Sequence, residues 1–253
     1  MSGHSKWSNI KRSKGANDAR RSQIFTKLAR EVTVAARQGG ADPEMNVRLR
    51  LAIQKARDQN MPTDNVERAI KRGTGPGDGA HTAMAEVLYE GYGPGGAAIF
   101  LEAFTDNPTR TVSELRNAFT RGGGNLGERG SVAWIFESKG IVVVDASPAQ
   151  AEELALTAID AGADDFDIEG RTLEIRTSIG TFEQVRKAIE KAGGAISRAE
   201  LSMVPKTTLS LDVKRATQTM HLMDRLEELD DVQRVYTNAD FPDEALEEYQ
   251  KAS

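Results

Sequence analysis

Residues 140–203 decide the fold and read GIVVVDASPAQAEELALTAIDAGADDFDIEGRTLEIRTSIGTFEQVRKAIEKAGGAISRAELSM. Apolar residues run together or alternate in four short segments and recur at helical spacing in two longer ones. The pattern predicts a strand at 140–145, a helix at 148–161, strands at 165–169 and 172–177, a helix at 180–192 and a strand at 196–203. That β-α-β-β-α-β order is typical of a ferredoxin-like domain, which we assign to residues 138–204.

A three-helix unit is predicted upstream, over residues 18–72. Apolar residues fall at helical spacing from 18 to 38, and Gly39-Gly40 ends that helix. Asp42-Pro43-Glu44 predicts the start of the second helix, with a capping Asp and a Pro at the first position. Its expected buried stripe is Met45, Leu49, Ala52, Ile53 and Ala56. A third helix is expected from Asp64 to Arg72, and GTGPGDG (73–79) is then interpreted as an interdomain linker.

The middle of the chain predicts a second α/β domain. Strands are expected at 84–91, 97–104 and 131–137, and a helix at 109–121. After Pro205 we expect a strand at 207–212, a helix at 215–229 and a strand at 232–237, which return to the same sheet, and a tail at 240–253 that frays.

The predicted fold is therefore α+β and multidomain. It has an all-α N-terminal domain followed by two α/β sandwich domains with antiparallel sheets, at least one of them ferredoxin-like. The expected domains are 1–79 (arm, three helices and linker), 80–137 plus 205–240 (discontinuous), and 138–204 (inserted).

Charge divides the chain by position. Residues 1–73 carry 16 Lys and Arg against 7 Asp and Glu, whereas residues 74–253 carry 17 against 31. The formal net charge of −5 thus conceals a strongly basic N-terminal part. Such a segment on an acidic protein is expected to hold nucleic acid locally, while the remainder repels it.

The composition narrows the other function classes. The chain has no cysteine, which excludes disulfides, thiolate zinc sites and cysteine nucleophiles. Its three histidines have no metal-ligand spacing, and no serine lies in a nucleophile elbow. We therefore expect no enzyme, no metal, no cofactor and no small-molecule substrate. No apolar run approaches the roughly 20 residues that span a bilayer, so no membrane partner is expected.

The basic arm SGHSKWSNIKRSKGANDARR (2–21) is the first candidate site. Lys and Arg can neutralise phosphates, and an exposed Trp7 could stack on a base. A solvated tail or a mitochondrial transit peptide would have a similar composition. The positive charge continues into the following helices, however, which favours nucleic-acid binding. The expected nucleic-acid-binding residues are Lys6, Trp7, Lys11, Arg12, Lys14, Arg20, Arg21, Lys27, Arg30, Arg48, Arg50, Lys55, Arg57, Lys71 and Arg72.

A secondary candidate lies in the loop Thr105-Asp106-Asn107 and in Arg110 beyond it. A polar loop at a helix start, with arginine beside it, could hold a backbone phosphate. The alternative is that Asp106 or Asn107 only caps the helix. We keep Asn107 and Arg110 as a possible secondary contact.

Several blocks resemble the YebC/PmpR family, which includes the mitochondrial translational activator of cytochrome c oxidase. The blocks are GHSKWSNIK (3–11), IFTKLAREVTVAAR (24–37), RLRLAIQKAR (48–57), NMPTDNVERAIKRGTG (60–75), YEGYGPGGAA (89–98) and GGNLGERGSVAWIF (123–136). The resemblance extends from residue 3 to about 240. It departs from the family pattern at Thr109, where Asn is usual, and at Val47, where Pro is common.

The resemblance implies three domains, a cytoplasmic location and a non-enzymatic role on nucleic acid. Members are described as DNA-binding transcriptional regulators or as ribosome-associated factors that help translation through difficult stretches. We expect ribosomal RNA as the target, because the cations spread over an arm and several helix faces. Promoter DNA is the alternative target. Two other function classes are an enzyme that acts on nucleic acid and a scaffold that binds only proteins. The protein is expected to be a monomer.

Overall fold

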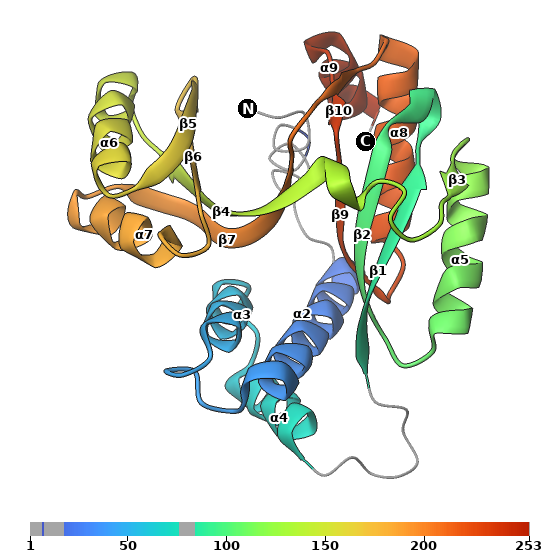
Figure 1. The fold of residues 1–253 in the computed structure, drawn as a ribbon. Coiled ribbons are helices and arrows are strands. Elements are labelled where there is room, and N and C mark those ends of the chain that lie inside the picture. The colour runs from blue at the N-terminus through green and yellow to red at the C-terminus, as the bar shows by residue number, and fades with distance from the viewer. Residues whose placement is uncertain (1–6, 8–17, 76–83, 253) are drawn as a thin grey trace.

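The computed structural model describes Trp7, residues 18–75 and residues 84–252 (Figure 1). Three helices form the N-terminal part, a four-stranded sheet with its helices forms the middle part, and a second four-stranded sheet with two helices forms the inserted part. This arrangement confirms the α+β fold class. The domain boundaries that we assigned remain a prediction.

The N-terminal part consists of α2 (Asp18–Gly39), α3 (Val47–Asp58) and α4 (Thr63–Thr74). The apolar stripes predicted from helical spacing meet in one core. Its buried members are Leu28, Val32, Ala35, Ala36, Leu49, Ala52, Ile53, Ala56, Met61, Val66 and Ala69.

The start of the second helix differs from the prediction. α3 begins at Val47, and the buried Asn46 is its cap, since Asn46 Oδ1 accepts from the Leu49 N–H at 3.0 Å. Asn46 Nδ2 also donates to the carbonyl of Ala35 at 2.8 Å, which ties the cap to α2. Met45 therefore precedes the helix and is 83% exposed, so its assignment to the buried stripe was wrong.

The linker prediction was wrong at its first two residues. Gly73 and Thr74 belong to α4. A Cβ on Gly73 would lie 2.4 Å from the carbonyl oxygen of Thr33, so glycine is needed here for the close approach of α4 to α2. Residues 76–79 lie outside the described residues.

The middle sheet has the order β3-β1-β2-β9. Its strands are β1 (Ala85–Tyr92), β2 (Ala98–Thr105), β3 (Asn125–Leu126) and β9 (Val232–Thr237), and the turn between β1 and β2 is η1 (Pro94–Gly96). α5 (Pro108–Arg121) and α8 (Val213–Glu227) contribute to its main core, and β9 pairs antiparallel with β2. The chain thus returns to this sheet after the inserted part, as predicted.

The inserted part confirms the ferredoxin-like prediction. Its elements are β4 (Phe136–Asp145), α6 (Pro148–Asp160), β5 (Ala163–Glu169), β6 (Thr172–Thr177), α7 (Phe182–Lys191) and β7 (Ala195–Pro205). All pairs in the order β5-β6-β4-β7 are antiparallel. Val142, Val144, Leu173 and Ile175 pack from the sheet into a core with the two helices.

Two segments after the first hairpin differ from prediction. Residues 133–135 form a 3₁₀ turn, η2 (Ala133–Ile135), instead of a strand, because the Glu90 carboxylate accepts the N–H groups of Val132 and Ala133. The strand expected at 207–212 shrinks to β8 (Leu209–Ser210), which pairs with β10 (Ala239–Asp240) in a separate two-stranded sheet. The expectation that this strand returns to the middle sheet was therefore wrong.

The acidic tail is a helix, contrary to the prediction that it frays. α9 (Asp243–Ala252) packs along α8, as Figure 1 shows. Ala245, Leu246 and Tyr249 are buried in the main core. An apolar stripe within a charged segment was therefore enough to dock it.

Trp7 is buried, so the expectation of an exposed ring was wrong. Its side chain is 1% exposed and belongs to the main core with residues of α8 and α9. Burying the large aromatic surface of the indole stabilises the folded protein, so the ring lies in the core and not in solvent.

We expect Trp7→Ala to lower the melting temperature, since truncating a buried Trp costs about 3–5 kcal/mol. Thermal unfolding followed by circular dichroism would measure it. Trp134→Ala is the matched control, because Trp134 is 68% exposed and should melt close to the parent chain. Equal melting of the Trp7 variant and the parent would contradict the burial of Trp7.

Candidate nucleic-acid interface

The predicted cations fall into three groups in the structure. Lys6, Lys11, Arg12 and Lys14 lie outside the described residues, as does the side chain of Arg20. A second group is engaged inside the protein: Lys27, Arg30, Arg48, Arg50 and Lys55. A third group, Arg57, Lys71 and Arg72, is exposed.

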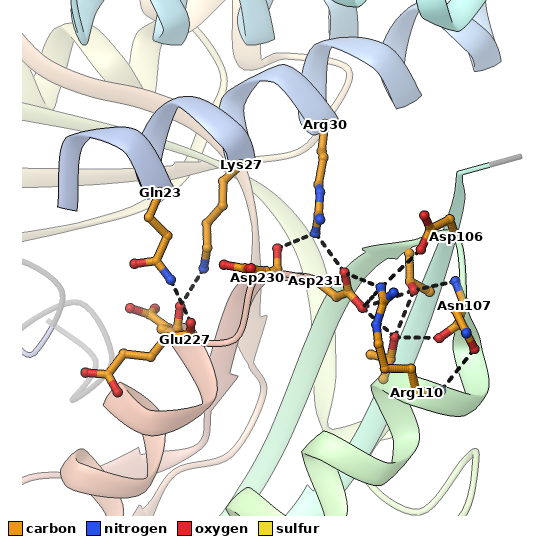
Figure 2. Close-up of polar contacts among 12 residues, drawn as sticks. Gln23, Lys27, Arg30, Asp106, Asn107, Arg110, Glu227, Asp230 and Asp231 are labelled. Atoms are coloured by element: carbon orange, nitrogen blue, oxygen red, sulfur yellow. Dashed lines mark hydrogen bonds and ion pairs between the residues drawn. The ribbon is translucent and has the colours of Figure 1, made fainter. Parts of the chain in front are cut away.

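Lys27 and Arg30 dock α2 onto the C-terminal end of α8. Lys27 Nζ donates to the carbonyl of Glu227, and Arg30 donates to the carbonyl of Asp230 (Figure 2). Gln23, one turn earlier, donates to the carbonyl of Glu228 at 2.6 Å. The last carbonyls of a helix lack partners within it and attract cations. These basic side chains therefore satisfy a helix terminus.

Asp231 is the acidic centre of the same interface. Its carboxylate is 3% exposed and accepts from Arg30 at 2.8 Å and from Arg110 at 2.8 Å (Figure 2). Thr105 and Thr111 add hydroxyl donors at 3.1 and 2.8 Å. Burial raises the pKa of Asp231, but these hydrogen bonds and the charge of Arg30 bring that pKa below its ordinary value.

The secondary candidate resolves into structural roles. Asn107 caps α5, since its Oδ1 accepts from the Arg110 N–H at 3.1 Å. The Arg110 guanidinium pairs with Asp106 at 3.0 Å as well as with Asp231. Asn107 is therefore a helix cap, which was the alternative interpretation, and Arg110 is ion-paired with two carboxylates.

Arg234 of β9 joins all three parts of the molecule. Its guanidinium lies 2.9 Å from Glu31 of α2, 3.7 Å from Glu102 of β2 and 3.8 Å from Glu200 of β7. It also donates to the carbonyl of Leu201. One cation therefore contacts carboxylates from the N-terminal, middle and inserted parts.

Arg48 and Lys55 extend this network on α3. Lys55 Nζ lies 2.9 Å from Glu31, and Arg48 lies 2.9 Å from Glu86 and 3.7 Å from Glu102. Both cations were expected to bind nucleic acid, and in the structure both pair with acidic groups of their own chain.

The network continues across the inserted sheet. Arg198 lies 3.6 Å from Glu200 and 3.8 Å from Glu174. Arg176 lies 3.2 Å from Glu174 and also pairs with Asp165 and Asp167. Charges alternate from the edge of the inserted domain to Arg234. Asp165 and Asp167 of this hairpin are thus ion-paired.

The carboxyl groups of the network have pKa values shifted in opposite directions. Burial raises the pKa of Glu31, but Lys55 and Arg234 more than reverse this and lower it to about 2. Burial and, to a smaller extent, a hydrogen bond with Glu86 raise the pKa of Glu102 to about 7, although the charges of Arg234 and Arg48 lower it. The pKa of Glu86 is lowered to about 2, with Arg48 outweighing burial. Of this pair, Glu86 therefore has the lowered pKa and Glu102 the raised one.

The three parts surround an open cleft of about 2270 Å³. Its lining carries both signs of charge, including Arg48, Lys55, Arg186 and Arg198 beside Glu86, Glu102, Glu174 and Glu200. The lining holds more carboxylates than cations, so the cleft disfavours a polyanion despite its arginines.

Arg57, Lys71 and Arg72 differ from the docked cations. They lie exposed at the ends of α3 and α4. Within the described residues, they have no carboxylate partner. Arg21 is exposed as well and lies over the ring of Phe25, 5.6 Å from its centroid. These side chains are available to an external anion.

Sequence reasoning missed Glu31, Glu102 and Arg234. A period-two pattern in VQRVYT (232–237) places Arg234 on the same face as Tyr236, which is buried. A charged residue on a buried face signals an ion pair. The sequence could therefore have flagged Arg234, but it could not have named its partners.

The described residues hold no cluster of three or more His, Cys, Asp or Glu side chains suited to a metal ion. Among these same residues, no helix has the length and apolarity required to cross a bilayer.

Glu102→Gln is expected to gain stability relative to the parent chain as pH rises. The folded pKa of Glu102 is about 7, above the ordinary 4.5. Between these values the folded state keeps a proton that the unfolded chain releases, so the parent loses stability as pH increases. Urea unfolding from pH 5 to 8 should show the variant gaining about 1–3 kcal/mol on the parent. The exposed Glu152→Gln is the control, and a pH-independent difference for Glu102→Gln would contradict the shift.

Two family models match the chain. The TACO1/YebC protein N-terminal domain matches residues 5–76, and the TACO1/YebC second and third domain matches residues 84–239. The crystal structure of a conserved hypothetical protein, Aq1575 of Aquifex aeolicus, superposes with a TM-score of 0.81 at 44% identity and covers 90% of this chain and 94% of that one.

Relatives of similar length carry a regulatory name. A "probable transcriptional regulatory protein" of Dehalococcoides mccartyi is 52% identical over 249 residues, 98% of each chain. Proteins of the same name from Moorella thermoacetica and Geobacter sulfurreducens are 54% and 51% identical, covering 96% and 98% of this chain and 96% and 99% of their own. The chain belongs to the TACO1/YebC family.

Proposed function

We propose that the protein is a non-enzymatic regulator of gene expression that binds nucleic acid through its N-terminal domain. The observation that carries this proposal is the exposure of Arg57, Lys71 and Arg72 without carboxylate partners in the described residues, on the domain that follows the basic arm. Phosphates are the anions that such unpaired cations attract. The regulatory names of the relatives support the same class of function.

The docked cations take no part in this proposed contact while the parts are arranged as described. Arg30 and Lys55 each bind a carboxylate at 2.8–2.9 Å, and a phosphate would have to displace it. The interface that we propose is therefore smaller than the predicted one. It consists of the arm and of the exposed cations on α2, α3 and α4.

Ribosomal RNA is the target that we favour, in a ribosome-associated translation factor. The exposed cations lie on different helices, and the basic arm would add further cations to the contact. An irregular RNA surface suits such spread contacts better than a regular groove.

One observation favours promoter DNA as the alternative. Only residues 59–62 separate α3 from α4, a turn length typical of a helix-turn-helix. α4 would then be the recognition helix, with Lys71 and Arg72 near its C-terminal end. The N-terminal residues of a recognition helix usually read bases, whereas these cations lie at the other end and suit phosphate contacts.

The double variant Lys71→Ala, Arg72→Ala is expected to bind RNA more weakly. Losing two phosphate contacts should flatten the log-log salt slope by roughly 1.4 for single strands. Fluorescence anisotropy with a labelled ribosomal RNA fragment, between 50 and 300 mM KCl, measures this. Lys187→Ala, Lys191→Ala removes the same charge from exposed positions of α7 and should leave the slope unchanged. Equal slopes for all three proteins would refute the proposed interface.

Crosslinking in cells separates the two targets. Ultraviolet crosslinking of the full chain, followed by sequencing of the attached nucleic acid, should recover ribosomal RNA. Enrichment of promoter DNA instead would favour the alternative, and recovery of neither would refute nucleic-acid binding.

A further inference from the structure

The second tryptophan of the chain is exposed. Trp134 lies on η2, between β3 and β4, and 68% of its surface is exposed. Its neighbours Val132, Ile135 and Phe136 point into a small core with Phe100 and Tyr236. The indole is thus the one large side chain of this turn that the fold leaves in solvent.

The indole is held in place although it is exposed. Its Nε1–H donates to the carbonyl of Ser131 at 3.1 Å, and the Tyr92 hydroxyl donates to the same oxygen at 3.0 Å. The loop beneath is fixed by Glu90, whose buried carboxylate accepts the N–H groups of Gly130, Val132 and Ala133 at 2.6–2.7 Å. A ring that is already ordered loses little entropy when a ligand stacks on it.

Two cations lie near the turn that carries the ring. Lys206 Nζ donates to the backbone carbonyl of Trp134 at 3.3 Å. Arg129 is exposed on the same loop, and its charge helps to lower the pKa of Glu90. Neither cation forms an ion pair at 4 Å or less with a described carboxylate. A fixed aromatic ring with cations beside it is the usual composition of a site for single-stranded nucleic acid.

We propose that Trp134 stacks on an unpaired base of the bound nucleic acid, while Arg129 and Lys206 contact the neighbouring phosphates. This inference rests on the proposed function and adds a second contact, on the middle part of the chain. A nucleobase fits better than an apolar protein surface, because Arg129 and Lys206 supply positive charge at this loop. The stacking role that the sequence suggested for Trp7 thus belongs to Trp134.

Tryptophan fluorescence tests the stacking directly. The full chain is titrated with a single-stranded 12-nucleotide RNA and, separately, with an RNA duplex of equal length. The single strand should quench the emission of Trp134 and protect it from acrylamide, whereas the duplex, whose bases are paired, should do neither. Trp134→Phe leaves only the buried Trp7 as emitter, so it gives the baseline.

Affinity supplies the second readout. Trp134→Ala should weaken single-strand binding roughly ten-fold and Trp134→Phe much less, because phenylalanine keeps a stacking ring. If RNA binds with its usual salt dependence but neither the emission nor the affinity depends on residue 134, stacking is refuted and the proposed function stands. If neither the parent protein nor any variant binds RNA or DNA, both the proposed function and the stacking inference are refuted. Binding of the duplex with equal protection of Trp134 would also overturn the inference.

Discussion

The guanidinium of Arg234 contacts carboxylates from all three parts of the molecule, and their arrangement depends on it. Glu31, Glu102 and Glu200 come from three separate elements, α2, β2 and β7. α2 shares no hydrophobic core cluster with the other two, whereas Met203 of β7 packs against a small cluster that includes Phe100 of β2. Removing the cation would leave three partly buried carboxylates close together, and an uncompensated buried charge costs about 3–5 kcal/mol. The planar guanidinium can serve several acceptors at once, which a lysine ammonium does less well.

Ion pairs of this kind explain how a basic N-terminal domain packs against the acidic remainder of the protein. α2 uses Lys27 and Arg30 to satisfy the carbonyls that follow α8, and α3 uses Arg48 to neutralise Glu86 and Glu102. Much of the positive charge near the N-terminus therefore holds the parts together. The cations that remain exposed are the smaller set that we assign to nucleic acid, and Trp134 would add a stacking contact away from them.

Local patterns predicted the elements well, and long-range contacts account for the errors. The alternation around Val142 and Leu173 predicted the ferredoxin-like sheet, because a two-residue period depends only on which face is buried. Met45 and Trp7 were misassigned because their burial depends on residues distant in the sequence. Asn46 could be recognised as a cap only once its bonds to Ala35 and Leu49 were known.

The candidate site was less predictable than the fold. Sequence identified cations but not which of them find a carboxylate. Arg30 and Lys71 look alike in the sequence, yet Arg30 meets Asp231, about 200 residues away, and Lys71 meets no described carboxylate. Such pairing follows from tertiary packing, which a single sequence does not display.

The distance between α3 and α7 tests the central claim most directly. The chain has no cysteine, so spin labels can be placed at Arg57→Cys and Lys187→Cys alone and their separation measured by pulsed electron resonance. The account predicts one narrow distribution in this labelled protein and a broad or displaced one after Arg234→Met, with the helix content unchanged. Arg171→Met breaks an exposed pair with Asp145 and should leave the distribution narrow. An equally narrow, undisplaced distribution without Arg234 would contradict the account.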